Sequence, residues 1–223
     1  VPSPVAHGSI RKLDCDKARQ VEGVHAFLTA SDVPGINDIA PVAHDEPLLT
    51  DKDVFAVGQA VALVIAEDLR SARQAAALIE LDIEEKKPIT TLAEAVAQKS
   101  FQGQPHHIVR GDPEGVLANA ELLLEGEVDS GGQDHFYLES QCALVVPEEH
   151  KGYQIYSSTQ HPSEVQAKVA EGLGIARHLG VVECPRMGGG FGGKETQAAH
   201  VAAWAALGAH ITRRPVKLWF NRD

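Results

Sequence analysis

The sequence has little cysteine, a single methionine and no surplus of positive charge. Its 223 residues contain 20 Lys and Arg against 31 Asp and Glu, which gives a formal net charge of −11. A protein that binds nucleic acid without sequence preference needs clustered Lys and Arg side chains that contact the negatively charged phosphates. The acidic balance therefore excludes a dedicated nucleic-acid-binding protein.

Long hydrophobic runs are missing as well. The longest apolar run near the middle of the chain covers residues 60–66, whereas a transmembrane helix needs about 20 apolar residues. We therefore expect no membrane span. Hydrophobic residues at 43% and charged residues at 23% are typical of a folded globular chain rather than a disordered one.

Cys15, Cys142 and Cys184 lie far apart and form no C-x-x-C pair. This pattern favours reduced thiols in a cytoplasmic protein over the alternative of a single disulfide. The only methionine is Met187, and residues 1–4 lack the basic and apolar regions of a signal peptide. We therefore expect the chain to be a piece of a longer protein.

The first hundred residues alternate between strand and helix patterns. Asp68 or Ser71 is expected to cap a helix over residues 72–80, and Thr91 with Glu94 forms a possible capping box for another helix. The apolar run at 60–66 suits a strand buried on both faces. The predicted strands cover residues 21–29, 60–66 and 81–84. These patterns predict a small mixed α/β domain over residues 1–100.

Residues 101–115 are the predicted linker, within a polar stretch without periodicity. It contains His106 and His107, but adjacent residues of an extended chain point to opposite sides, so we do not expect a metal site there. A second domain is predicted over residues 116–223. Its expected strands cover residues 120–128, 142–146, 153–156, 181–184 and 216–220, and its expected helices cover residues 162–173 and 194–207. The whole chain is therefore predicted to be α+β.

Charge is distributed unevenly in the second half. Residues 101–183 hold four Lys and Arg with thirteen Asp and Glu, a net charge of −9, whereas residues 184–223 hold six and two, a net charge of +4. This is either ordinary surface variation or a sign that the C-terminal segment meets an anion.

Five of the twenty glycines occupy residues 188–193. A loop this rich in glycine can take positive φ and exposes its backbone N–H groups, so a ligand can approach the backbone closely. Between a strand and a helix N-terminus it would also present the positive end of the helix dipole.

Three interpretations of this loop compete. It matches a dinucleotide fingerprint formally, but Arg213, Arg214 and Pro215 stand where an acidic residue is needed. It matches a P-loop up to Lys194, after which Glu195 replaces the hydroxyl that holds magnesium. A plain tight turn needs only one or two glycines.

Two residues of the loop carry side chains of interest. Phe191 is either a plug into the core or an aromatic wall for a flat ligand. Glu195, expected in the first turn of the following helix, is either a simple partner of the helix dipole or a carboxylate aimed into a site beside the loop.

Several long motifs in order give the chain a family resemblance. Residues 182–196, with the core Met-Gly-Gly-Gly-Phe-Gly-Gly-Lys-Glu-Thr, resemble the molybdenum-binding loop of xanthine dehydrogenases. Residues 131–139 and 158–160 are similar to further signatures of that family. Residues 3–8, 29–35, 46–49 and 57–64 resemble its α/β hammerhead domain. The resemblance implies an α/β hammerhead domain followed by the first part of a mixed α/β molybdopterin-binding domain.

The resemblance also implies a reaction, the hydroxylation of hypoxanthine or xanthine with water as oxygen source. Gln160 matches the glutamine that hydrogen-bonds an oxo ligand of molybdenum. Phe191 and Gly192 match residues lying over the metal, while Gly189 and Gly190 match residues that approach the cofactor. Glu195 matches the substrate-binding glutamate.

The implied cofactors and partners extend beyond this chain. Molybdenum-molybdopterin would bind here, whereas the 2Fe-2S clusters, FAD, the general-base glutamate and the arginine facing the substrate would come from other domains or subunits of an oligomer. We therefore expect these 223 residues alone to be inactive. The alternatives are a non-catalytic assembly module and a glycine-loop nucleotide-binding protein.

Overall fold

A computed structural model describes residues 1–222, and its contacts divide the chain into two units. The first unit combines Val1–Lys87 with the residues from His135 onward, and the second is Pro88–Asp134. Among residues 1–222, every helix is too short or too polar to cross a bilayer.

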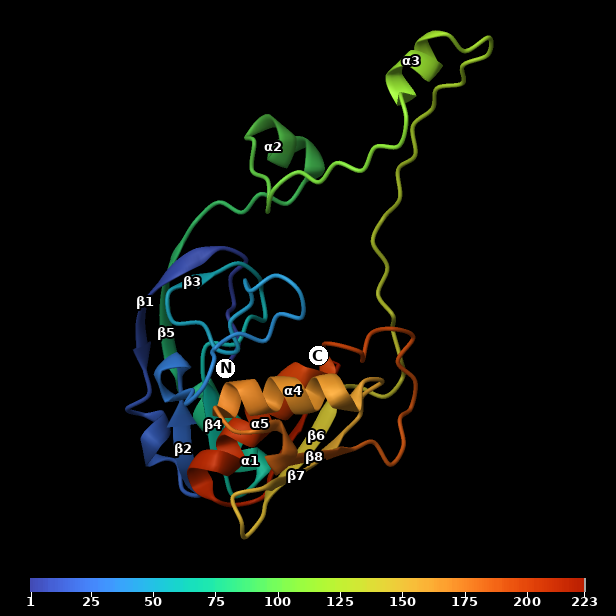
Figure 1. Ribbon diagram of the computed structural model, residues 1–223. Helices are drawn as coiled ribbons and strands as arrows, with labels where there is room; N and C mark the ends of the chain where they lie inside the picture. The colour runs from blue at the N-terminus through green and yellow to red at the C-terminus, as the bar shows by residue number, and fades with distance from the viewer. Residues whose placement is uncertain (223) are drawn as a thin grey trace. The chain divides into compact units, whose positions relative to one another are not determined.

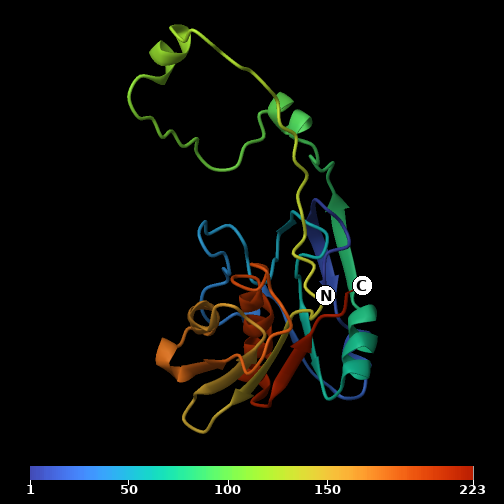
Figure 2. The same ribbon diagram turned by 90° about the vertical axis from the view of Figure 1, so that its right-hand side faces the viewer.

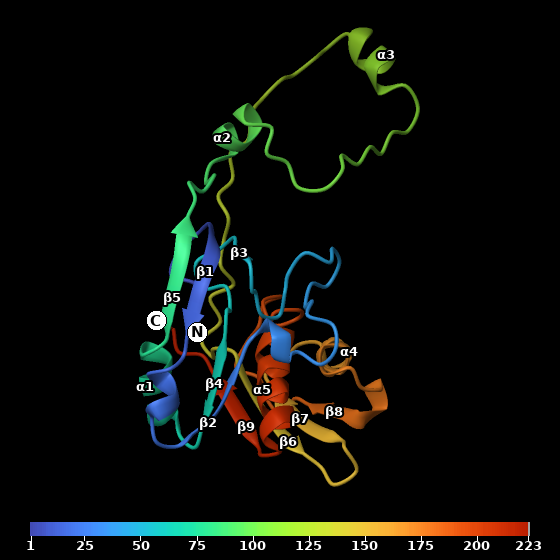
Figure 3. The same cartoon turned by 90° about the vertical axis from the view of Figure 1, so that its left-hand side faces the viewer.

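The N-terminal part of the first unit contains two small antiparallel sheets (Figure 3). One has the strand order β3-β1-β5 and the other pairs β2 with β4. The strands are β1 (Gly8–Asp14), β2 (Val24–Leu28), β3 (Asp53–Val54), β4 (Leu63–Ala66) and β5 (Glu80–Glu85), with 3-10 turns at Ala18–Gln20 and Ala30–Asp32. The helix α1 (Leu69–Ala77) joins β4 to β5. The order β4-α1-β5 confirms the predicted strand-helix-strand pattern, whereas β1 and β3 were not predicted.

Two details of this part differ from the sequence prediction. The strand expected at 60–66 covers only Leu63–Ala66 and is half-buried, because it pairs with β2 alone at the side of a two-stranded sheet. The helix begins at Leu69 rather than at residue 72, because Asp68 is the cap: its Oδ1 accepts the N–H of Ser71 at 2.8 Å.

The C-terminal part of the first unit is a four-stranded sheet covered by two helices (Figures 1 and 2). Its strand order is β8-β7-β6-β9, and only the β7–β8 pair is parallel. The strands are β6 (Cys142–Pro147), β7 (Tyr153–Ser157), β8 (Gly180–Glu183) and β9 (Val216–Trp219). The helix α4 (Pro162–Leu173) and a 3-10 turn at Arg177–Leu179 form the crossover between the parallel strands. As the sequence predicts, α4 opens with Pro162 and ends at Gly174, which is left-handed at φ 64°.

The helix α5 (Ala198–Thr212) is the centre of the first unit. It packs on α4 and β6 and also contacts β2 and β4 (Figure 1). Ten of its fifteen residues are buried, most of them alanine, because it is enclosed on several sides. One hydrophobic core therefore joins both parts of the first unit, and it includes Leu28, Leu48 and Leu49 with Val145 and Val169.

The second unit carries two short helices, α2 (Leu92–Ala97) and α3 (Pro113–Ala118). The Thr91 hydroxyl accepts the N–H of Glu94 at 3.2 Å, which confirms the predicted cap of α2. The sequence analysis missed α3, although Asp112 before Pro113 is a typical helix start.

The strand predicted at residues 120–128 is wrong. The segment carries no strand hydrogen bonds, and its apolar side chains, such as Leu124 and Val128, are exposed. An extended segment becomes a strand only when another strand pairs with it, and no sheet of the described chain includes these residues. The boundaries predicted around residues 101–115 stay a prediction.

Candidate cofactor-binding site

The glycine loop lies between β8 and α5, as expected. Gly189 and Gly192 have φ values of 96° and 95°, and Phe191 between them has φ 53°. The left-handed conformation is cheap for glycine and strained for phenylalanine. Phe191 is 75% exposed, so it is not a plug into the core and its ring is free to meet a ligand.

The helix after the loop begins later than predicted. α5 starts at Ala198 with Gln197 as its cap, and its first turn contains no acidic residue. Glu195 lies before the helix and is exposed, so the expectation that it sits in the first helical turn is wrong. The physical reason is that the Lys194 carbonyl accepts hydrogen bonds from outside the helix, from Gln160 N–H at 2.8 Å and from the Thr159 hydroxyl at 3.0 Å.

Gln160 follows the end of β7 and lies against the loop. Its Oε1 accepts the N–H groups of Gly192 at 3.0 Å and Lys194 at 3.2 Å. These two hydrogen bonds to Oε1 fix the orientation of the amide. Within residues 1–222 the Nε2 of Gln160 has no hydrogen-bond partner. An amide held this way presents two N–H donors to whatever lies beside the loop.

Three of the glycines are required by lack of space. A Cβ on Gly190 would lie 2.3 Å from Oε1 of Gln160, and a Cβ on Gly193 would lie 2.6 Å from Cε1 of Tyr137. At Gly188 it would lie 2.7 Å from Cβ of Glu139. At Gly189 and Gly192 the positive φ favours glycine, because other residues are strained in that backbone conformation.

An ion pair with a buried lysine and a partly exposed glutamate lies beside the loop, and the sequence did not predict it. Lys194 is fully buried, and its Nζ donates to Oε2 of Glu139 at 2.7 Å and to Oγ of Ser158 at 2.9 Å. The ammonium also lies 4.8 Å from the centre of the Tyr137 ring. No local pattern around Lys194 or Glu139 indicates this pairing, because the two residues are 55 positions apart.

The environment of Glu139 keeps it ionised. Partial burial raises its pKa, but hydrogen bonds from Lys194, Ser158 and the Gly188 N–H outweigh this and lower the pKa to about 2. The Gly188 N–H lies 2.9 Å from the same Oε2, and the Ser158 hydroxyl donates to it as well.

These contacts exclude the P-loop interpretation of the glycine loop. A P-loop lysine must reach the phosphates, whereas Lys194 is buried and neutralised by Glu139.

Two arginines of the basic C-terminal segment lie away from the loop. Arg213 donates to the Tyr153 hydroxyl at 3.2 Å and Arg214 lies 3.5 Å from Glu67. Both follow the far end of α5, whose 15 residues span about 22 Å. Arg213 and Arg214 therefore do not reach the loop, and the expectation that this segment meets an anion stays a prediction for its other basic residues.

Metal-ligating residues do not gather at the site. Within residues 1–222, no group of three His, Cys, Asp or Glu side chains could hold a metal ion. His106 and His107 are both exposed. Cys15, Cys142 and Cys184 are free thiols.

Sequence comparison assigns both parts of the chain. The sequence model of the molybdopterin cofactor-binding domain matches residues 96–223, and that of the aldehyde oxidase and xanthine dehydrogenase a/b hammerhead domain matches residues 1–87. The chain belongs to the aldehyde oxidase and xanthine dehydrogenase family.

Relatives in this family match the whole chain. It is 39% identical over 223 residues to xanthine dehydrogenase of Dictyostelium discoideum and 40% identical over 226 residues to that of Drosophila pseudoobscura pseudoobscura. All of this chain is covered in both cases, but only 16% and 17% of the relatives. The chain thus spans about a sixth of the length of these relatives.

Solved structures of the family share the fold. The aldehyde oxidoreductase of Desulfovibrio gigas matches with a TM-score of 0.84 and 28% identity, over 99% of this chain and 26% of that one. Quinoline 2-oxidoreductase of Pseudomonas putida 86 matches with a TM-score of 0.79 and 27% identity, over 100% and 30%. These matches confirm the predicted fold class, with a hammerhead domain followed by molybdopterin-binding structure.

The residues of the loop fit the molybdenum-molybdopterin cofactor of the family. The space beside Gly190 admits no side chain, the Gln160 amide has two free donors, and Phe191 is exposed. A neutral amide can donate to a metal's oxygen ligand without changing the charge of the site.

Proposed function

We propose that the protein containing this chain hydroxylates a purine of the hypoxanthine or xanthine type and that this chain supplies one wall of the molybdenum site. When bound, molybdenum-molybdopterin supplies the two-electron oxidation of a ring carbon, with water as the source of oxygen. The observation that carries the proposal is the Gln160 amide, whose oxygen is held by two loop N–H groups while its nitrogen is free. The relatives bearing the name xanthine dehydrogenase support the purine substrate.

Each loop residue has a proposed role. Gln160 donates from Nε2 toward an oxygen on the metal, and the backbone of Gly189, Gly190 and Gly192 allows close approach of the cofactor. Phe191 offers its exposed ring as an apolar surface over the centre.

Glu195 is the proposed substrate-binding residue. Its exposed carboxylate follows the loop directly and can accept a hydrogen bond from a purine ring N–H. A carboxylate that orients the ring and stabilises charge developing on it lowers the barrier more than it strengthens ground-state binding.

Other parts of the protein would complete the assembly. We propose that the rest of the molybdopterin-binding domain, an iron–sulfur domain and an FAD domain lie outside this chain, in an oligomer. The three free thiols support a location in the reducing cytoplasm.

The test is Glu195→Gln in the full-length protein, with kcat and KM measured for xanthine. We expect kcat/KM to fall by about a hundredfold or more, because the charge of the carboxylate acts in the transition state. Glu149→Gln, in the exposed turn between β6 and β7, is the matched control and should leave kcat/KM unchanged. Unchanged turnover in Glu195→Gln would instead indicate that this chain serves only as a scaffold.

A further inference from the structure

The ion pair of Lys194 and Glu139 connects the two ends of the glycine loop. Oε2 of Glu139 accepts the N–H of Gly188, the first glycine, at 2.9 Å and the Nζ of Lys194, just after the last glycine, at 2.7 Å. One carboxylate oxygen from a distant segment therefore fixes the separation of the loop's two ends. Ser158, one residue after β7, donates to the same oxygen.

The backbone of Lys194 connects this pair to Gln160. Its N–H donates to Oε1 of Gln160 at 3.2 Å, and its carbonyl accepts the Gln160 N–H at 2.8 Å. A movement of Lys194 would therefore shift one of the two N–H groups that hold the Gln160 amide and the carbonyl that holds the Gln160 backbone.

The ammonium of Lys194 is fully satisfied where it is. Two of its three donors reach Glu139 and Ser158, and the third side faces the Tyr137 ring. Because Lys194 is 0% exposed, it does not touch a ligand at the loop surface. Burying the charged lysine of such a pair has a desolvation cost, although the pair can fix one conformation among several.

We propose that Lys194, Glu139 and Ser158 form a latch that holds the glycine loop in its cofactor-binding shape, with Lys194 and Glu139 as positioning residues. This inference rests on the proposed function of the loop. It predicts that loss of the latch loosens residues 188–194 and turns the Gln160 amide away, while the sheet and helices stay intact.

Amide hydrogen exchange in the full-length protein, freed of cofactor, tests the latch directly. Lys194→Met keeps the length of the side chain and removes its donors. We expect exchange in residues 188–194 to become about tenfold faster or more, the effect of losing one hydrogen bond to a charged group. Exchange in α4 and α5 should stay within twofold of wild type. Glu139→Gln, which keeps the volume and an acceptor oxygen, should show a smaller change in the same segment and replaces Lys194→Met if that variant does not fold.

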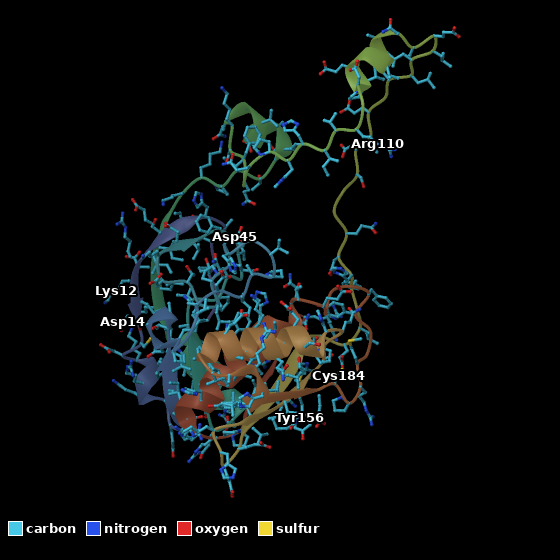
Figure 4. The ribbon with its side chains drawn as sticks, in the orientation of Figure 1. Lys12, Asp14, Asp45, Arg110, Tyr156 and Cys184 are labelled. Atoms are coloured by element: carbon cyan, nitrogen blue, oxygen red, sulfur yellow. The ribbon has the colours of Figure 1, made fainter. Side chains whose placement is uncertain are left out.

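The matched control is the ion pair of Lys12 and Asp14 on β1, whose atoms are 2.8 Å apart (Figure 4). Lys12→Met makes the same substitution at an exposed lysine, far from the turn after Cys184 that leads into the loop. It should leave exchange in residues 188–194 unchanged. The latch proposal would be overturned if residues 188–194 of Lys194→Met exchanged at the wild-type rate. It would also be overturned if exchange in α4 and α5 accelerated as much as in the loop.

Molybdenum content separates this proposal from the proposed function. In the holoenzyme, Lys194→Met should retain about tenfold less molybdenum after dialysis than wild type. If the wild-type protein binds no molybdenum, the proposed function fails, whereas the exchange measurement still decides the latch.

Discussion

At the scale of single residues, the five loop glycines serve two different physical needs. Gly188, Gly190 and Gly193 lie where a Cβ would collide with a neighbour, while Gly189 and Gly192 have positive φ. The run of glycines predicts that a ligand can approach the loop backbone closely. It does not show which neighbouring side chains require glycine at each position. Those contacts come from Gln160, Glu139 and Tyr137, which precede the loop by tens of residues, so no local pattern reveals them.

Gly190→Ala should damage the site through Gln160. The new Cβ would lie 2.3 Å from Oε1 of Gln160, so the amide must leave its two loop donors. We expect a loss of about 1–3 kcal/mol in the free energy of unfolding together with loss of bound molybdenum. Urea unfolding and metal analysis measure both. Gly126→Ala, which meets nothing within 4 Å and has no positive φ, should leave both properties unchanged; equal effects of the two variants would contradict the crowding argument.

The pKa of Glu139 predicts a pH-dependent contribution to stability. Its folded-state pKa is about 2, below the ordinary value of 4.5, so the ionised carboxylate stabilises the fold above pH 4.5 and this contribution is lost as the pH falls towards 2. The difference in unfolding free energy between wild type and Glu139→Gln should therefore be constant near neutral pH and shrink below pH 4.5. Urea unfolding at a series of pH values measures it. A difference independent of pH down to 3 would show that the carboxylate is not stabilised as described.

At the scale of elements, local signals predicted most boundaries well. Asp68 and Thr91 cap α1 and α2, and Pro162 with Gly174 brackets α4, because each acts on backbone groups within a few residues. Two of the failures are non-local. The start of α5 is delayed by hydrogen bonds from Thr159 and Gln160, and residues 120–128 lack the neighbouring strand that their pattern requires.

The contact between α5 and β4 offers a test of how the two parts of the first unit fit together. A Cβ on Gly208 would lie 2.6 Å from Cδ1 of Ile65. Gly208→Leu should lower the free energy of unfolding by about 1–3 kcal/mol because it overfills this contact. Adding Ile65→Ala to Gly208→Leu should restore part of the lost free energy of unfolding, although Ile65→Ala alone should lower the free energy of unfolding. Additive effects in this double-mutant cycle, measured by urea unfolding, would contradict direct packing of α5 on β4.

At the scale of the whole molecule, the hammerhead part and the molybdopterin-binding part share one core. Trp204 of α5 donates its indole N–H to the carbonyl of Leu48 at 2.8 Å, and Gly35 donates its N–H to Gly172 of α4 at 3.0 Å. The sequence predicted two successive domains because strand and helix patterns restart after the polar stretch. The packing of the two parts on each other depends on contacts such as that of Trp204 with Leu48, 156 residues apart, which no local pattern indicates.

The position of molybdenum in the full-length protein tests the central claim most directly. Anomalous X-ray diffraction at the molybdenum absorption edge, from crystals of the purified holoenzyme, locates the metal without reference to activity. We predict a single peak beside the glycine loop, with an oxygen ligand of the metal in hydrogen-bond reach of Gln160 Nε2 and the ring of Phe191 over the centre. A molybdenum peak remote from Gln160 and Phe191, or a fully folded protein without molybdenum, would contradict the account.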